Sequence, residues 1–342
     1  MQLDIDLTGR DVLVTGTDTA ARQAVRRFEA AGAVVHRLAA PQAVDAALPA
    51  KPFLVAAVDD GQPGWEPLLA GYRAAGVPVA AEPSAGARGR VTLVGGGPGT
   101  TDLLTVAAVT ALRDADVVFY DRLAPYQELP SLTSAILVDV GKKPGHHKVG
   151  QSDIEKLMVE SALAGNNVVR LKGGDPYVFG RGGEEVAACV AAGLEVQVVS
   201  GVTSAISVPA AAGIPVTHRN VSHMFTVVSG HAPLTDKEHH HLAGLGGTIV
   251  VLMGIGTLHH LAAGLRRAGM RADMPMAVVE RGYRPGQRTT IANLGTIAAA
   301  AAGCSNPAVL VIGEVVRVAE ANRGHAEAAA DLDRLAASLL GS

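Results

Sequence analysis

A glycine-rich loop at residues 94–99, V-G-G-G-P-G, lies directly between a predicted strand at 91–94 and a predicted helix at 103–112. Glycine lets backbone approach a ligand closely, so the loop is a candidate binding element, with a tight ligand-free turn as the alternative. The dinucleotide spacing G-x-G-x-x-G is not met, because Pro98 removes one amide donor and Thr100 replaces the third small residue. The Gly-Lys-Ser/Thr ending of a phosphate-binding loop is absent as well. The loop therefore favours a neutral or cationic ligand over a pyrophosphate.

Two further loops of unusual composition follow predicted strands. The first spans residues 172–185 after a strand at 168–172, and the second spans 200–205 after the next strand. In an open parallel sheet, ligands bind where the carboxyl ends of the strands meet, so we expect the three loops to converge on one edge. Asp121, directly after a strand at 117–120, is either a ribose ligand at that edge or an ordinary strand-end carboxylate.

The succession of elements predicts an α/β protein. Alternating strands and helices in residues 1–85 predict a small, degenerate Rossmann-like domain, and residues 86–90 read as a Gly/Arg-rich linker. Residues 91–213 repeat the alternation and predict a second α/β unit. In residues 214–318 helices join only some of the strands, which predicts a partly antiparallel sheet. The Ala-rich segment 319–342 is expected to form a helical tail.

Composition argues against several classes of function. A formal charge of −3 disfavours nucleic-acid binding, and no apolar run is long enough to span a membrane. Because acidic Asp4 and Asp6 stand where a basic leader would lie, the expected location is cytoplasmic. Cys189 and Cys304 lack metal or disulfide spacing and read as small core residues. The consecutive histidines 239–241 lack the i, i+4 spacing of a shared metal, so they read as solvated surface and no metal is expected.

Seven motifs in a fixed order link residues 91–318 to a known family. They read V-G-G-G-P-G at 94–99, Y-D-R-L at 120–123, G-K-K-P-G-H-H at 141–147, V-V-R-L-K-G-G-D-P-Y-V-F-G-R-G-G-E-E at 168–185, G-V-T-S-A at 201–205, G-I-P-V-T-H-R at 213–219 and M-G at 253–254. This pattern closely resembles the uroporphyrinogen III C-methyltransferases, which belong to the tetrapyrrole methyltransferases. The R-L-K-G-G-D-P run is especially specific to that family.

The resemblance implies a two-domain tetrapyrrole methylase fold that binds S-adenosylmethionine between its domains. It places the family's proton acceptor on Asp121 and its proton donor on Lys142. Asp175 is expected to supply an anionic acceptor to the cofactor. In-line methyl transfer depends mainly on positioning and needs no metal. The implied cofactor contacts are Pro98, Gly173, Gly174, Asp175, Val178, Thr203, Ser204, Met253 and Gly282.

The implied reaction is C-methylation of uroporphyrinogen III at C2 and C7 to give precorrin-2, on the way to sirohaem or cobalamin. The substrate carries many carboxylates, so cations should rim the site, although each one alone is more often a solvated surface charge. The resemblance also implies a homodimer. The candidate cations are Arg122, Lys142, Lys143, His146, His147, Lys148, Arg181 and Arg219.

Two departures from the family pattern stand out. Ser200 occupies the place where proline usually precedes the glycine of the third loop, which loosens that loop. Residues 1–85 resemble a shortened dehydrogenase module of multifunctional sirohaem synthases, but their turn has only Gly16, and Arg37 ends the second strand where a ribose-binding acid is wanted. Asp59 corresponds to the active-site aspartate of that module. We expect NAD-dependent dehydrogenation and ferrochelation to be lost, so NAD is not an expected cofactor.

Three other functions stay open at this point. A sirohaem synthase that retains precorrin-2 dehydrogenase activity would need its N-terminal unit to bind NAD. A methyltransferase for a later precorrin would be expected to lack the R-L-K-G-G-D-P-x-x-F-G-R-G-G-E-E pattern found at 170–185. A non-catalytic tetrapyrrole-binding regulator would be expected to lose several of Asp121, Lys142 and the glycine loops, all of which are present.

Overall fold

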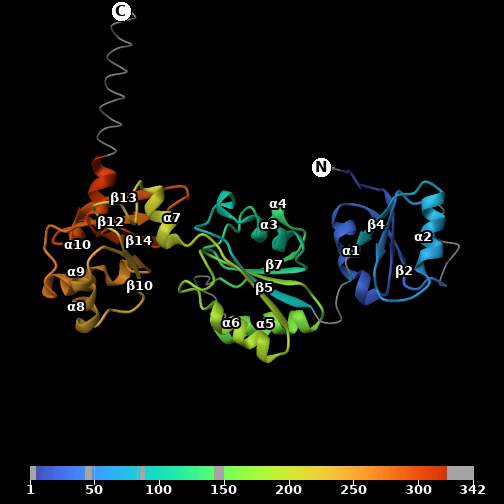
Figure 1. Cartoon of the computed structure of the whole chain (residues 1–342), viewed down its shortest axis with the longest axis horizontal. Coiled ribbons are helices and arrows are strands. Elements are labelled where there is room, and N and C mark those ends of the chain that lie inside the picture. Colours follow the sequence, from blue (N-terminus) through green and yellow to red (C-terminus); the bar gives the residue numbers. More distant parts are fainter. Residues whose placement is uncertain are drawn as a thin grey trace, which may run out of the picture.

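The computed structural model describes residues 5–42, 48, 49, 51–82, 84, 89–141 and 150–321. Its strands form three sheets that lie in a row along the longest axis of the molecule (Figure 1). Each sheet is built from one continuous stretch of sequence, and the predicted α/β class is confirmed. Within the described ranges, no helix is both long and apolar enough to cross a membrane.

The N-terminal unit is a parallel sheet of order β2-β1-β3-β4 with one helix on each face. Successive residues of β1 point to opposite faces, so Val12 and Val14 pack with α1 while Leu13 packs with α2. Both faces are thereby covered, as a parallel sheet requires. The elements are β1 (Asp11–Thr15), α1 (Asp18–Ala30), β2 (Val34–Leu38), β3 (Leu54–Val58), α2 (Trp65–Ala74) and β4 (Val79–Glu82).

The middle unit is a second parallel sheet, of order β7-β6-β8-β5-β9. Helices α3 and α4 cover one face and α5 and α6 cover the other (Figure 1). The strands are β5 (Arg90–Gly95), β6 (Val117–Tyr120), β7 (Ile136–Asp139), β8 (Val168–Lys172) and β9 (Glu195–Val199). The helices are α3 (Val106–Arg113), α4 (Leu129–Leu132), α5 (Gln151–Leu163) and α6 (Gly182–Ala191).

The C-terminal unit has the mixed sheet that its sparse helices predicted. Its order is β10-β11-β14-β12-β13, in which only the β10–β11 pair is parallel. The strands are β10 (Phe225–Ser229), β11 (Thr248–Leu252), β12 (Pro275–Glu280), β13 (Arg288–Asn293) and β14 (Ala308–Ile312). The helices are α7 (Ser204–Ala211), α8 (Asp236–Leu245), α9 (Leu258–Arg267) and α10 (Ile297–Ala300).

Helix α7 joins the two larger units. It follows β9 of the middle sheet directly, yet its Ala205 and Val208 pack into the core of the C-terminal sheet against Val250 and Val309. The chain therefore crosses between the units at the carboxyl end of β9. This crossing brings the loops of the middle sheet next to the C-terminal sheet.

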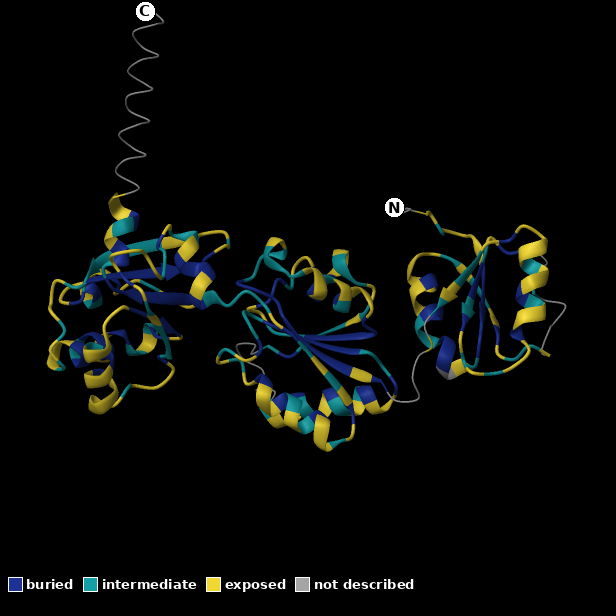
Figure 2. Ribbon diagram, in the orientation of Figure 1, coloured by how far each residue is buried: buried dark blue, intermediate teal, exposed yellow. Residues whose placement is uncertain are grey.

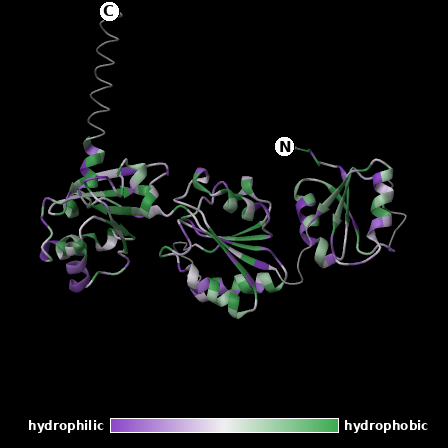
Figure 3. Cartoon of the chain, viewed as in Figure 1, coloured by the Kyte–Doolittle hydropathy of each residue, from purple (hydrophilic) through white to green (hydrophobic). Residues whose placement is uncertain are grey.

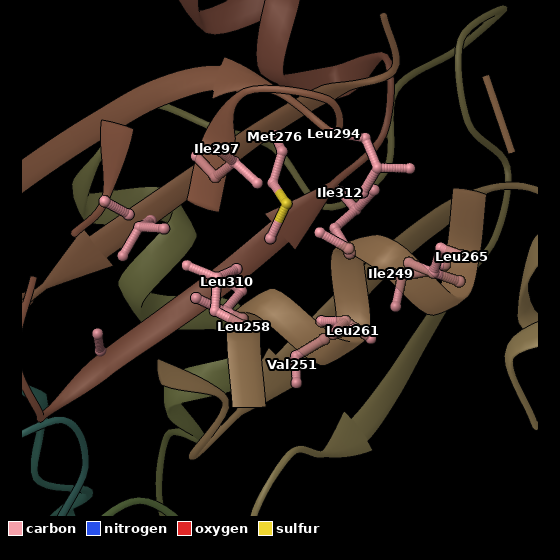
Figure 4. Packing of buried hydrophobic residues seen from close by; sticks show 14 of the residues in the cluster. Ile249, Val251, Leu258, Leu261, Leu265, Met276, Leu294, Ile297, Leu310 and Ile312 are labelled. Atoms are coloured by element: carbon pink, nitrogen blue, oxygen red, sulfur yellow. The ribbon is translucent and has the colours of Figure 1, made fainter. Parts of the chain in front are cut away.

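The core of the C-terminal unit is apolar and densely packed. Met276 and Leu310, from adjacent strands, face Leu258 and Leu261 of α9 (Figure 4). Every residue of β11, β12 and β14 is buried, which explains why these segments read as continuous apolar runs rather than as alternating strands. Figures 2 and 3 show the same division in all three units, with buried apolar strands inside and exposed helix faces outside.

One predicted helix start needs correction. The chain after the first glycine loop forms a short 3₁₀ turn, Thr101–Leu103, and α3 begins only at Val106. The reason is a local cap, because Thr105 Oγ1 accepts a hydrogen bond from Ala108 N at 3.1 Å. Helix α5 begins at Gln151 and is also held by a local cap, because the Asp153 carboxylate accepts a hydrogen bond from Gly150 N at 3.0 Å.

The prediction that histidines 239–241 form a solvated run is wrong for His239. This side chain is buried between α8 and α9, where a Cβ on Gly264 would overlap its ring, and the His260 ring lies 5.4 Å away. Burial holds the pKa of His239 below its usual value, which favours the neutral ring. Among the described residues, no group of histidine, cysteine and acidic side chains is arranged to hold a metal.

Candidate active site

A cavity of about 610 Å³ lies between the middle and C-terminal units, at the carboxyl ends of β5 and β8. Its volume lies within the usual range of small-molecule sites. An apolar part of its wall is formed by Val178, Val208, Leu252, Val279, Ala308 and Val309. The charged side chains that line it are Asp121, Arg170, Lys172, Arg181, Arg281 and Arg284.

The three glycine-bearing loops converge on this edge as predicted, because β8, β5 and β9 are neighbours in the sheet. Gly97 and Gly174 pair backbone to backbone, with N–H···O distances of 3.2 and 2.6 Å. A Cβ on Gly201 would lie 2.6 Å from Gly95 Cα and closer still to Gly174 O. Only glycine allows three backbones to meet this closely.

Asp121 directly follows β6 and lines the cavity with its carboxylate partly exposed. One oxygen accepts a hydrogen bond from Leu123 N at 3.0 Å. The other lies 3.4 Å from Nη2 of Arg170, a residue of the neighbouring strand β8. The sequence left two interpretations of Asp121 open, and the structure places it at the cavity with its side chain held from both sides.

Behind Asp121 lies a buried group of charges. Arg170 Nε is 3.1 Å from Oε1 of Glu185, and Lys172 Nζ is 2.9 Å from Oε2 of the same carboxylate. Gln151 Nε2, at the start of α5, also donates to Glu185 Oε1 at 3.2 Å. Burial lowers the pKa of Lys172 and Arg170 lowers it further, while Glu185 and Asp121 act against this.

Arg284 connects the two sides of the cavity. It lies between β12 and β13 of the C-terminal unit, and its Nε donates to Pro98 O of the first glycine loop at 3.3 Å. Nη1 donates to Arg122 O at 3.3 Å, and Nη2 donates to Leu123 O. A single guanidinium thus holds the first glycine loop and the segment after Asp121 against the other unit.

Strained backbone is concentrated at the cavity. Phe179, Arg181, Met253 and Arg281 all line it and have positive φ angles of 54°, 60°, 58° and 50°. Such angles are unfavourable for residues with a Cβ and persist where the surrounding structure imposes them, often at functional sites.

Comparison with known proteins decides the family. Residues 90–298 match the family described as Tetrapyrrole (Corrin/Porphyrin) Methylases, which is more than half of the chain. The chain belongs to the tetrapyrrole methylases. The matched range contains the whole middle unit and most of the C-terminal unit, and therefore both sides of the cavity.

Relatives are similar to this chain over two thirds of its length or more. An S-adenosyl-L-methionine-dependent uroporphyrinogen III methyltransferase of Methanosarcina barkeri is 47% identical over 237 residues, which are 67% of this chain and 93% of that protein. A siroheme synthase of Gluconobacter oxydans is 42% identical over 277 residues, 76% of this chain but 59% of that protein. The crystal structure of uroporphyrin-III C-methyl transferase from Thermus thermophilus complexed with S-adenyl homocysteine is 41% identical, with a TM-score of 0.56 over 67% of this chain and all of that one.

Most of the predicted cofactor contacts meet at the methylase cavity. Its lining includes Pro98, Gly173, Gly174, Val178, Ser204, Met253 and Gly282. Asp175 and Thr203 are absent from the lining. The Asp175 carboxylate accepts hydrogen bonds from Tyr177 N at 2.8 Å and Gly201 N at 3.1 Å, so it ties the second loop to the third. Thr203 caps α7 by accepting from Ala205 N at 3.3 Å.

The predicted substrate cations are more scattered. Arg181 lines the cavity, and its Nε lies 3.0 Å from the Glu184 carboxylate. Arg122 lies 3.5 Å from Asp139, and neither Arg122 nor Arg219 is part of the cavity lining. The other candidates, Lys142, Lys143, His146, His147 and Lys148, lie outside the described residues.

Several charged residues at the cavity escaped the sequence reasoning. Arg170 and Lys172 stand within the R-L-K-G-G-D-P run at 170–176 but were not among the predicted site residues. Their spacing of two residues on a strand puts both on one face, which was a usable signal. Arg284 carries no comparable signal, because its partners lie more than 150 residues earlier in the chain.

The N-terminal sheet has a differently built carboxyl edge. Asp60, two residues after β3, fills the position beside the N-terminus of α1, where its Oδ2 accepts a hydrogen bond from Thr17 N at 2.9 Å. Its Oδ1 accepts from Trp65 Nε1 at 2.9 Å. Asp59, the predicted counterpart of a dehydrogenase aspartate, is exposed, and its Oδ1 accepts from Gly61 N at 3.2 Å. The carboxylate of Asp60 thus occupies the position where a dinucleotide-binding fold binds pyrophosphate.

Proposed function

We propose that this chain is an S-adenosylmethionine-dependent methyltransferase that converts uroporphyrinogen III to precorrin-2 by methylation at C2 and C7. The observation that carries the proposal is the cavity between the two methylase units, where three glycine-lined loops meet Asp121 and several cations. The named activities of the Methanosarcina relative and of the Thermus structure support the same assignment.

The residues of the cavity fit the proposed cofactor. The apolar wall around Val208 and Val279 suits an adenosine ring, and the glycine loops leave room for close backbone contact. Pro98, Gly173, Gly174, Val178, Ser204, Met253 and Gly282 would hold it, with Asp175 and Thr203 fixing the loops from behind. When bound, S-adenosylmethionine supplies an electrophilic methyl group.

The remaining groups suit a substrate that is rich in carboxylates and has a proton to lose. Arg181 and Arg281 offer guanidinium groups at the cavity, and such groups bind carboxylates well. Asp121, held by Leu123 N and Arg170, is the proposed proton acceptor. Lys142 remains the proposed proton donor.

The test is anaerobic incubation of the purified chain with uroporphyrinogen III and methyl-labelled S-adenosylmethionine. We expect the wild-type protein to transfer label to the macrocycle and to give the absorption spectrum of precorrin-2. An Asp121→Asn variant should transfer little label. Glu160→Gln, on the exposed side of α5, is the matched control and should behave as wild type. Absence of label with wild-type protein that still binds S-adenosylhomocysteine would refute the substrate and leave a later precorrin or a regulatory role.

We also propose that the methylase units form a homodimer. Tyr177, Phe179, Ile206 and Phe225 are exposed and line a common groove beside α7. A contiguous apolar surface of this kind is typical of protein interfaces. Sedimentation equilibrium should give twice the chain mass, and Ile206→Glu should give a monomer, whereas a monomeric wild type would contradict the proposal.

A further inference from the structure

The buried charges beneath the cavity form one connected cluster. Arg170 and Lys172 are each 4% exposed, and Glu185 is completely buried between them. Burying charges is costly unless they are paired with good geometry. Here Glu185 contacts both cations and Arg170 extends the chain of contacts to Asp121, although Glu185 Oε2 lies close to Lys172 Nζ without a hydrogen bond of good geometry.

The cluster fixes where Asp121 points. Besides its contacts with the two carboxylates, Arg170 donates from Nη1 to Leu171 O at 2.8 Å and to Phe119 O at 3.4 Å. Its guanidinium therefore has little freedom to turn. Nη2 is directed at Asp121 Oδ2, while Leu123 N holds the other oxygen.

The charges of the cluster cancel. Arg170 and Lys172 contribute two positive charges, and Glu185 and Asp121 contribute two negative ones. Of the other charged residues that the structure describes near this site, Arg284 binds backbone carbonyls from the C-terminal side and Arg122 faces Asp139. Arg181 pairs with Glu184, and Arg281 lines the same cavity. When the cluster takes up one proton, it therefore carries a net positive charge beside the cavity.

We propose that Arg170, Lys172 and Glu185 are positioning residues that keep Asp121 an oriented carboxylate, and that their summed charge sets the lower pH limit of the reaction. The inference rests on the proposed function. In the step concerned, a C–H bond of the methylated, cationic ring breaks, its electron pair neutralises the ring, and the proton passes to Asp121. The cluster, which then carries a net positive charge, attracts the carboxylates of the macrocycle.

Removing one charge of either sign tests this directly. Lys172→Met leaves the cluster with one excess negative charge, so it takes up a proton more readily. The acid limb of the kcat/KM profile should move to higher pH by about one unit, the size expected for a full charge several ångströms away at an effective dielectric constant of about 20. Glu185→Gln leaves an excess positive charge, and the limb should move to lower pH.

Matched controls come from the exposed Lys156–Glu160 pair on α5, whose Nζ and Oε1 lie 3.8 Å apart. Lys156→Met and Glu160→Gln should keep the wild-type profile. Acid limbs that coincide with those of the controls, or that move in the same direction in both variants, would overturn the inference. Should Glu185→Gln fail to fold, the shift in Lys172→Met decides alone. A wild type without methyl transfer would instead refute the proposed function, which keeps the two failures distinct.

Discussion

The middle and N-terminal units share a parallel α/β design, yet their carboxyl edges are built in opposite ways. In the middle unit, glycine backbones from three loops pack together and leave a cavity in front of them. In the N-terminal unit, the carboxylate of Asp60 occupies the space beside α1 and binds Thr17 N and the Trp65 side chain. A shared topology thus sets where a ligand could bind, but the side chains at that edge decide whether one does.

The largest effect should come from adding one methyl group where the three loops meet. In Gly201→Ala the new Cβ overlaps Gly174 O and Gly95, both backbone atoms that cannot turn away. We expect a stability loss of about 3 kcal/mol and at least about a 100-fold loss of methyl transfer, because displaced loops misplace both reactants. Gly71→Ala in α2, which has nothing within 4 Å, is the control and should leave activity intact. Full activity in Gly201→Ala would show that the loop packing is dispensable.

A smaller effect is expected where the two methylase units are tied together. Arg284→Met removes hydrogen bonds to Pro98 O, Arg122 O and Leu123 O but keeps much of the side-chain volume. Since charged hydrogen bonds typically contribute about 1.5–3 kcal/mol, kcat/KM should fall about tenfold to a hundredfold. Arg267→Met, at an exposed ion pair of α9, should have no effect on steady-state kinetics. Equal kcat/KM values in the two variants would show that the hydrogen bonds of Arg284 are not needed for activity.

The smallest effect should be confined to the N-terminal unit. Burial acts to raise the pKa of Asp60, but hydrogen bonds from Gln62, Trp65 and Thr17 outweigh it and hold that pKa below its usual value. The resulting stability is present above about pH 4 and lost as pH falls through the lowered folded-state pKa. Asp60→Ala should lower the stability of this unit by about 1–2 kcal/mol at pH 7 and leave methyl transfer unchanged.

Trp65 is the only tryptophan in the chain, so its fluorescence during urea unfolding reports the N-terminal unit separately. Asp60→Ala should shift that transition and abolish the part of its acid dependence that comes from Asp60. The control is Asp59→Ala, which removes the exposed carboxylate next to Asp60 and should shift the transition much less. Equal shifts in the two variants would contradict the role given to Asp60.

The sequence predicted those parts of the molecule that depend on local pattern. The glycine-rich loops after predicted strands indicated which edge of the middle sheet carries the site. The small number of helices after residue 214 predicted the mixed C-terminal sheet. What it missed depends on contacts between distant segments. Glu184 and Glu185 are adjacent acids in the sequence, which does not reveal that Glu184 is exposed while Glu185 is buried beside β8. His239 likewise looked like part of a polar run until α9 was seen to cover it.

The most direct test of the contrast between the two edges is calorimetric titration of the full chain with S-adenosylhomocysteine and, separately, with NAD⁺. Our account predicts saturable binding of S-adenosylhomocysteine that Gly201→Ala abolishes, and no saturable heat with NAD⁺. Saturable binding of NAD⁺ that Gly16→Ala or a substitution of Asp60 alters would mean that the N-terminal edge is open to a ligand and would contradict the account.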